Sequence, residues 1–265
     1  LFLVKTGVDV NVSYYTMAQR IVTVIAGVVT GAIGVSVPRL SYYLGIGKKE
    51  EYINLVNRGS RIFNFFIIPL SFGLMILGPQ AILLYGSEKY IGGANLTSIF
   101  AVRTIILALD TILGSQILFT NGFEKRITVY TVFAGILNLI MDSLLYFNNI
   151  ITPEYYLITT MLSESFLLIL YAIFIHKRQL ISLRHIFKYT VRYSLFALTF
   201  VPIYFLVNFI YPVKMVINLP FLINMLIIMV LSALSYIGLL VWTKDSIFYE
   251  FLGHFISLKR RIKRS

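Results

Sequence analysis

Long apolar stretches follow one another along most of the chain, and short polar segments separate them. A helix rises about 1.5 Å per residue, so about 20 apolar residues cross a hydrocarbon core of about 30 Å. By this measure the sequence predicts seven transmembrane helices, over residues 13–43, 62–85, 94–120, 127–147, 155–175, 193–211 and 219–242. Strands of a membrane barrel would alternate in polarity, so the pattern predicts an all-α membrane protein.

The first two spans form a hairpin around which the other spans can be oriented. The first ends at Pro38 and Arg39, a short charged connection follows, and the second apolar span then begins. Pro69 and Pro79 in the second span and Pro202 in the sixth are expected to kink their helices. Proline removes a backbone donor, and its ring clashes with the preceding turn.

Two segments are amphipathic and are expected to lie at the membrane surface. Residues 50–60 carry apolar side chains on one helical face, and so do residues 247–256. The second segment leads into the basic run LKRRIKR near the end of the chain. That combination predicts an amphipathic helix on an anionic membrane surface.

Composition agrees with the membrane assignment. Hydrophobic residues make up 58% of the chain, the mean hydropathy is +0.84, and only 13% of residues are charged, about half the usual share in soluble domains. The net charge of +12 does not indicate nucleic-acid binding, because the basic residues cluster between apolar spans. The absence of cysteine excludes disulfides and thiolate metal sites, and the three histidines have no ligand spacing.

The basic clusters predict the topology. They fall in residues 44–61, 121–126 and 176–192 and in the tail from 243, whereas the opposite side carries only Lys5, Lys89 and Lys214. The positive-inside rule therefore places the C-terminus in the cytoplasm and residue 1 outside. Because the chain begins at Leu1 without a signal pattern, we expect further helices upstream.

Three arginines are predicted to bind an anionic substrate. A charge at the bilayer centre costs about 2.5–3.5 kcal/mol on insertion scales, so it must face protein or water. Arg20 shares a face of the first span with small and hydroxyl residues, Arg103 lies near the middle of the third span, and Arg39 lies at the cytoplasmic edge of the first. The alternatives are a packing seam from which Arg20 extends to the interface, headgroup contact for Arg39, and a buried ion pair for Arg103.

Three acidic residues within the spans are candidates for coupling transport to an ion. Asp110 follows Arg103 by seven residues and shares its helical face, which also suggests an Arg103–Asp110 pair. Asp142 and Glu164 lie in the fourth and fifth spans. Such carboxylates can bind H⁺ or Na⁺, but they also accept interhelical hydrogen bonds, and both roles stay open.

The sequence predicts neither an enzyme nor a cofactor. It contains no glycine-rich phosphate loop, no Ser/His/Asp order and no acidic motif at a membrane face. A membrane polysaccharide polymerase would need a large external loop with catalytic residues, whereas the predicted external connections are short.

Motifs spread over residues 10–175 resemble the polysaccharide-transport branch of the MOP flippase superfamily. They are Pro38-Arg39-Leu40-Ser41, the Gly45 and Gly47 turn, Pro69 with Gly73, Tyr85-Gly86 with Tyr90, Val12-Ser13-Tyr14-Tyr15 with Ala18, Gln116 with Gly122 and Lys125, Asn138, and Ser163-Glu164. Members have fourteen helices, in two six-helix lobes plus a terminal pair. The resemblance implies a C-terminal lobe over residues 1–175, the terminal helix pair over 176–242 and a basic cytoplasmic tail over 243–265, with the N-terminal lobe missing.

The resemblance further implies a Wzx-type flippase of the bacterial cytoplasmic membrane. Such a protein moves undecaprenyl-pyrophosphate-linked oligosaccharide repeat units outward for capsule or exopolysaccharide synthesis. A cationic cavity with alternating access would shield the diphosphate and glycan, with Arg20 and Arg103 at the diphosphate. The last two spans would border a groove for the polyprenyl tail, and anionic lipids would be further partners. The alternatives are a drug or cation antiporter of the same superfamily, which should favour acids over arginines, and the polymerase.

Overall fold

The computed structural model describes residues 9–253, and within them all side chains except those of residues 9–10, 25–26, 28–30 and 32–34. The described residues form helices and no strands. The elements are α2 (Asp9–Gly34), α3 (Ser36–Gly45), α4 (Lys49–Ile76), α5 (Gly78–Gly86), the 3₁₀-helix η1 (Glu88–Gly93), α6 (Ala94–Asp110), the π-helix η2 (Thr111–Phe119), α7 (Glu124–Phe147), α8 (Pro153–Lys177), α9 (Arg184–Ala197), α10 (Phe200–Ile210) and α11 (Leu219–Trp242). A further helical stretch covers residues 246–253.

Within the described part of the chain, six helical segments are long and apolar enough to cross a membrane. They are Lys49–Ile76, Glu88–Phe119, Glu124–Phe147, Pro153–Lys177, Arg184–Ile210 and Leu219–Trp242. The chain is thus an all-helical, multi-pass membrane protein, and these segments correspond to six of the seven predicted spans. The remaining predicted span, residues 13–43, is helical as α2 and α3 with a break at Val35. It is not one of the six, so the seventh crossing stays a prediction.

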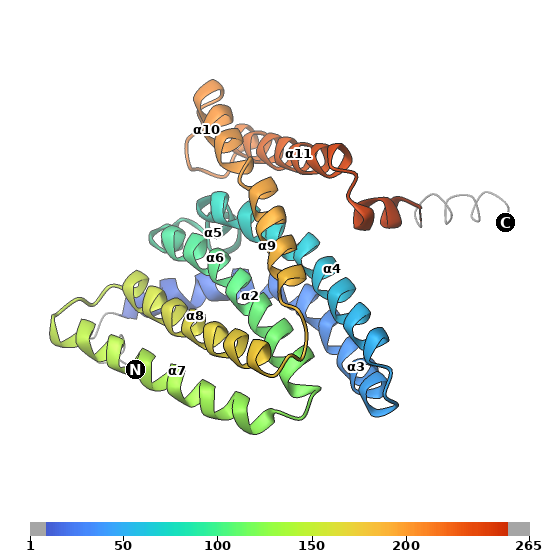
Figure 1. Cartoon of the computed structure of the whole chain (residues 1–265). Coiled ribbons are helices and arrows are strands. Elements are labelled where there is room, and N and C mark those ends of the chain that lie inside the picture. The colour runs from blue at the N-terminus through green and yellow to red at the C-terminus, as the bar shows by residue number, and fades with distance from the viewer. Residues whose placement is uncertain (1–8, 254–265) are drawn as a thin grey trace.

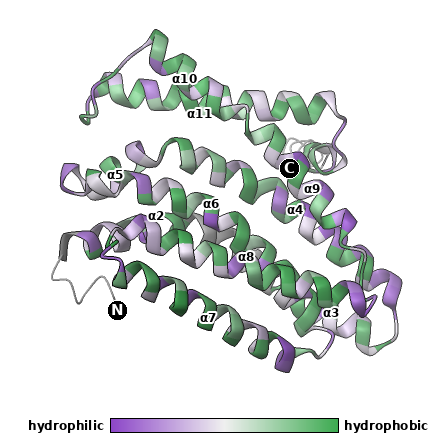
Figure 2. Cartoon of the chain, turned by 60° about the vertical axis from the view of Figure 1, so that its left-hand side comes forward, coloured by the Kyte–Doolittle hydropathy of each residue, from purple (hydrophilic) through white to green (hydrophobic). Residues whose placement is uncertain are grey.

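The helices form a bundle with an outlying pair (Figure 1). α4 packs against α6 and α9, α6 packs against α8, and α7 packs along the outside of α8. α10 and α11 pack against each other and lie as a separate layer, which Figure 2 shows together with the apolar surfaces of α7 and α11. α7 fully buries only Ala134 among its side chains, so most of its apolar surface is exposed.

The basic connections gather at one end of the bundle. Figure 1 shows the turns α3–α4, η2–α7 and α8–α9 and the segment after α11 on one side, and the connections α7–α8 and α10–α11 on the other. This is the alternation that the basic residues predict. Which end faces the cytoplasm stays a prediction.

The three prolines expected to kink helices behave differently. Pro69 lies inside the continuous helix α4, and Pro79 lies in the first turn of α5, directly after the break at Leu77. The sixth span breaks between α9 and α10 just before Pro202. The ring of a proline clashes with the carbonyl four residues earlier, here that of Leu198, which instead accepts a bond from the Val201 amide at 3.2 Å.

The two segments expected at the membrane surface are integrated into the bundle as far as they are described. Residues 50–60 are not a separate surface helix, because α4 runs without interruption from Lys49 to Ile76 and buries Tyr52 and Val56. Their apolar face contacts protein instead of the membrane interface. In the tail, Ile247 is 4% exposed, and the part of the predicted amphipathic helix from residue 254 onward lies outside the described residues.

The buried side chains form two clusters that share α4 and α6. The larger joins these helices to α8, α9 and α11 and contains Tyr52 and Tyr193 among its fully buried rings. The smaller joins them to α2 and α5 and includes Val22, Leu74 and Phe100. α2 is therefore held by a modest core of its own, and much of its described surface is exposed.

Candidate functional site

An ion pair links two of the membrane-spanning helices. α6 carries Arg103 and α8 carries Glu164, and the guanidinium of Arg103 faces the carboxylate of Glu164. Arg103 Nε donates to Glu164 Oε2 at 2.8 Å and Arg103 Nη2 donates to Oε1 at 2.5 Å. The side chains are 18% and 20% exposed. This two-pronged geometry is the strongest form of an arginine–carboxylate contact, and it satisfies the charge of both groups inside the membrane span.

A polar cavity of about 310 Å³ lies beside this pair, between α2 and α6. Its lining residues are Gln19, Val22, Thr23, Gly27, Phe100, Arg103, Thr104 and Leu107. The two threonine hydroxyls donate to backbone carbonyls of their own helices, at 2.8 Å for Thr23 and 3.1 Å for Thr104. The donors that the cavity offers are therefore the guanidinium of Arg103 and the amide of Gln19, because the hydrogens of both hydroxyls are used within their own helices. A guanidinium beside an amide suits an anionic group with several acceptor oxygens.

The other two predicted arginines lie apart from this cavity. Arg20 is exposed on α2 and does not line the cavity, although its neighbour Gln19 does. One residue corresponds to about 100° around a helix, so the two side chains leave α2 in different directions. Arg39 is exposed on α3, where Nη2 donates to the Tyr43 hydroxyl at 3.1 Å and the guanidinium lies 5.6 Å from the ring centre.

The three predicted acids occupy three different environments. Glu164 is paired with Arg103, so the suggested Arg103–Asp110 pair is not formed; seven residues span about 10.5 Å along a helix, too far for contact. The half-buried Asp110 carboxylate makes no hydrogen bond or ion pair with the described residues. It sits where α6 gives way to the π-helix η2, and such wide turns are frequent at functional sites. Asp142 on α7 accepts a 2.5 Å bond from the Thr159 hydroxyl on α8.

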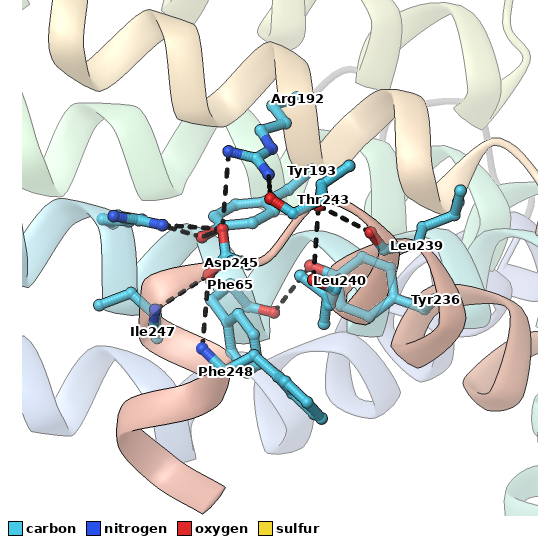
Figure 3. Close-up of polar contacts among 11 residues, drawn as sticks. Phe65, Arg192, Tyr193, Tyr236, Leu239, Leu240, Thr243, Asp245, Ile247 and Phe248 are labelled. Carbon is cyan, nitrogen blue, oxygen red and sulfur yellow. Dashed lines mark hydrogen bonds and ion pairs between the residues drawn. The ribbon is translucent and has the colours of Figure 1, made fainter.

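A second buried charge cluster was missed by the sequence analysis. Asp245, whose side chain is 0% exposed, lies between α11 and the helical residues 246–253. Its Oδ2 accepts from Arg61 Nη2 at 2.8 Å and from the Tyr193 hydroxyl at 3.2 Å. Its Oδ1 accepts from the backbone amide of Ile247 at 3.0 Å, which caps the following helix (Figure 3). An aspartate just before an amphipathic run is an N-cap signal that could have been found.

The same cluster binds the tail to the bundle. Arg192 Nη1 lies 3.8 Å from Asp245 Oδ2, and Arg192 Nη2 donates to the Thr243 carbonyl at 3.3 Å. On the next turns, Arg58 pairs with Glu250, and the Phe251 ring stacks on that of Phe65 of α4 with the ring centres 6.0 Å apart. The start of the tail is therefore docked between α4 and α9.

A large apolar groove runs between α4, α5, α11 and this docked segment. Its volume is about 860 Å³, and among the described residues Ser232 and Tyr236 are the polar side chains that line it. Pro69 and Gly73 line it from α4, and Phe251 lines it from the tail. Leu74 of the groove belongs to the same core cluster as two side chains that line the polar cavity. The apolar groove and the polar cavity thus both border this smaller core cluster.

Among the described residues, no three His, Asp or Glu side chains gather as a metal site would require. Comparison with known proteins gives neither a matching protein-family model nor a similar curated protein. The resemblance to the MOP flippase superfamily therefore stays a prediction.

Proposed function

We propose that the chain is part of a transporter that carries a polyprenyl-diphosphate-linked oligosaccharide across the bacterial cytoplasmic membrane. The observation that carries the proposal is Arg103, a guanidinium inside a membrane-spanning segment that lines a polar cavity. Ionisable groups at such depth are costly unless they face a polar space or a partner, and Arg103 has both. A diphosphate headgroup is the anionic chemistry that this cation would recognise.

The apolar groove supports the same substrate class. A polyprenyl tail is pure hydrocarbon, and a groove of about 860 Å³ with two polar lining side chains provides the matching surface. A groove bordered by the last two spans was expected. The groove in the structure lies mainly between α11 and α4, and Phe200 is the residue of the sixth span that lines it. In this proposal the diphosphate headgroup of one substrate molecule binds in the polar cavity and its polyprenyl tail binds in the groove.

The transport cycle would follow alternating access with the C-terminus in the cytoplasm. In this proposal Asp110, Asp142 and Glu164 are the candidates for coupling to H⁺ or Na⁺, and a further N-terminal lobe would complete the cavity on the open face of α2. Arg20, exposed on α2, would then face that lobe. The basic tail would contact anionic lipid headgroups.

Reconstitution tests the proposal directly. The full-length protein is placed in liposomes that carry an undecaprenyl-diphosphate-linked disaccharide, and a membrane-impermeant glycosidase reports how much of it reaches the outer leaflet. We expect complete digestion with the protein and digestion of about half, the outer leaflet alone, without it. Equal digestion in both preparations would contradict the proposal.

One observation favours a cation antiporter as the second candidate. Asp110 is a carboxylate within a membrane-spanning segment and has no partner among the described residues, as a proton or Na⁺ carrier would require. The same liposomes with an imposed pH gradient separate the candidates. Efflux of a lipophilic cation dye that Asp110→Asn abolishes, without any movement of the lipid-linked disaccharide, would establish the antiporter instead.

A further inference from the structure

The two partners of the Arg103–Glu164 pair stand in different relation to the polar cavity. Arg103 lines it and Glu164 does not. Glu164 uses both carboxylate oxygens on Arg103, through Nε and Nη2. The third nitrogen of the guanidinium, Nη1, has no acceptor among the described residues. The guanidinium therefore keeps a donor nitrogen that Glu164 does not use.

The space beside Arg103 can hold a ligand. A volume of about 310 Å³ corresponds to about ten water molecules at about 30 Å³ each. The two threonine hydroxyls of the lining are bonded to carbonyls of their own helices. Arg103 is the one charged residue among the described residues that line the cavity, so it is the group there that would attract an anion.

We propose that Glu164 is the resident counter-anion of Arg103 and that a phosphate group of the substrate displaces it in each transport cycle. This inference rests on the proposed function. A phosphate presents two oxygens to the guanidinium fork as a carboxylate does, so it can replace Glu164 on Nε and Nη2. The unpaired Nη1 is a further donor for such a ligand.

The exchange explains why an intramembrane cation would carry a built-in anion. An arginine left alone in the membrane would destabilise the empty protein, and Glu164 removes that cost. The same carboxylate competes with the substrate, which lowers substrate affinity and permits release on the far side. Glu164 acts through Arg103 and is a positioning residue in this scheme.

Binding to Glu164→Gln tests the competition. The full-length protein is placed in phosphatidylcholine nanodiscs, and the Kd for undecaprenyl diphosphate is measured with undecaprenol as the uncharged reference. Because the amide keeps the shape but not the charge of the competitor, we expect Kd to fall about tenfold while the export rate also falls. The matched control is Glu154→Gln on the same helix, for which Kd should stay within about twofold.

The outcomes separate this inference from the proposed function. An unchanged or weaker affinity in Glu164→Gln overturns the role of Glu164 and leaves the substrate assignment intact. No binding of undecaprenyl diphosphate beyond that of undecaprenol, in wild type and variant alike, overturns both. Replacing phosphatidylcholine by phosphatidylglycerol shows whether a lipid phosphate competes for the same site, in which case the measured Kd rises in wild type.

A charge exchange keeps the test decisive if Glu164→Gln folds poorly. The double variant Arg103→Glu/Glu164→Arg restores an ion pair but moves the cation onto α8, away from the cavity lining. We expect it to recover the thermal stability lost by Arg103→Glu alone and to bind undecaprenyl diphosphate no better than undecaprenol. Binding equal to wild type in the exchanged protein would overturn the inference.

Discussion

Two arginine–acid pairs in this protein share the same chemistry and differ in what surrounds them. Arg61–Asp245 has a fully buried carboxylate that also accepts from a tyrosine hydroxyl and a helix N-terminus. Arg103–Glu164 has a carboxylate that is 20% exposed and bonded only to its arginine. In the first pair the Asp245 side chain is 0% exposed, whereas the second pair adjoins a polar cavity.

The difference separates a structural joint from an exchangeable contact. Every acceptor of Asp245 is used, so no ligand could replace it without leaving donors unpaired in the core. Glu164 contributes nothing but charge and two oxygens, and a phosphate supplies both. The surroundings of an ion pair thus indicate whether it holds a fold or a substrate.

The largest expected effect comes from breaking the Arg61–Asp245 ion pair. Asp245→Ala leaves Arg61 buried without its anion and removes the cap of the tail helix. Breaking a buried pair in this way costs about 3–5 kcal/mol of unfolding free energy. Thermal unfolding in detergent should show a large decrease in Tm, and limited proteolysis should release the tail.

A matched acid on the surface serves as the control. Glu124 is exposed in the first turn of α7, where its favourable interaction with the helix dipole amounts to at most about 1 kcal/mol. Glu124→Ala should therefore change Tm little. If Asp245→Ala were as stable as Glu124→Ala, the Arg61–Asp245 pair would not hold the tail on the bundle. The two ion pairs would then not differ in their structural role.

Removing the cation of the second pair should affect transport more than folding. Arg103→Ala loses charge-assisted bonds of about 1.5–3 kcal/mol to a substrate phosphate, a decrease in export of about 10–100-fold, while membrane insertion persists. Surface glycan and membrane-fraction immunoblots measure the two effects. Arg103→Lys should recover only part of the export, since an ammonium cannot form the fork.

The exposed Arg126 on α7 provides the control for Arg103. Arg126→Ala should leave export within about twofold of wild type, because surface substitutions rarely exceed about 0.5 kcal/mol. Normal surface glycan in Arg103→Ala would assign a structural role to Arg103 and make the two pairs equivalent.

The fold was largely predictable because each membrane span is encoded locally. Twenty apolar residues are required to cross the bilayer, and six predicted spans have that length in the structure. The break before Pro202 follows from the missing amide of proline. The continuity of α4 through residues 50–60 was not predictable from the sequence. It depends on a core in which Tyr52 and Val56 pack against side chains of other helices.

The candidate site was predictable only in its residue types. The depth of Arg103 marked it as buried or polar-facing, but its partner is 61 positions away on α8, and helix periodicity compares only neighbours on one helix. The same limit hid the burial of Asp245, whose capping role is local while its arginine partners lie on α4 and α9. The sequence pattern indicated which charges are costly, and the tertiary structure decides how each is satisfied.

A change in the apolar groove should separate headgroup binding from tail binding. Gly73 lines the groove, and a Cβ there would meet no atom within 4 Å. Gly73→Leu fills space that a polyprenyl chain would use, and the loss of about two buried methylene contacts at about 0.8 kcal/mol each weakens binding about tenfold. The measured quantity is the Kd for undecaprenyl diphosphate in nanodiscs.

The control for Gly73→Leu is an equally open glycine outside the groove. Gly238 on α11 is exposed and also has nothing within 4 Å of its added Cβ. Gly238→Leu should leave the Kd unchanged, and both variants should bind inorganic pyrophosphate as wild type does. Equal effects of the two substitutions on the Kd would mean that the groove does not bind the polyprenyl tail.

The smallest expected effect concerns the third arginine–acid pair of the tail. Arg58 and Glu250 meet at the surface, with side chains 60% and 35% exposed, so water already solvates both charges. Arg58→Ala should cost at most about 0.5 kcal/mol, and high salt should erase that difference. A loss as large as that of Asp245→Ala, measured by the same thermal unfolding, would mean that tail docking and not burial sets the strength of these pairs. The distinction between Arg61–Asp245 and Arg103–Glu164 would then need a cause other than their surroundings.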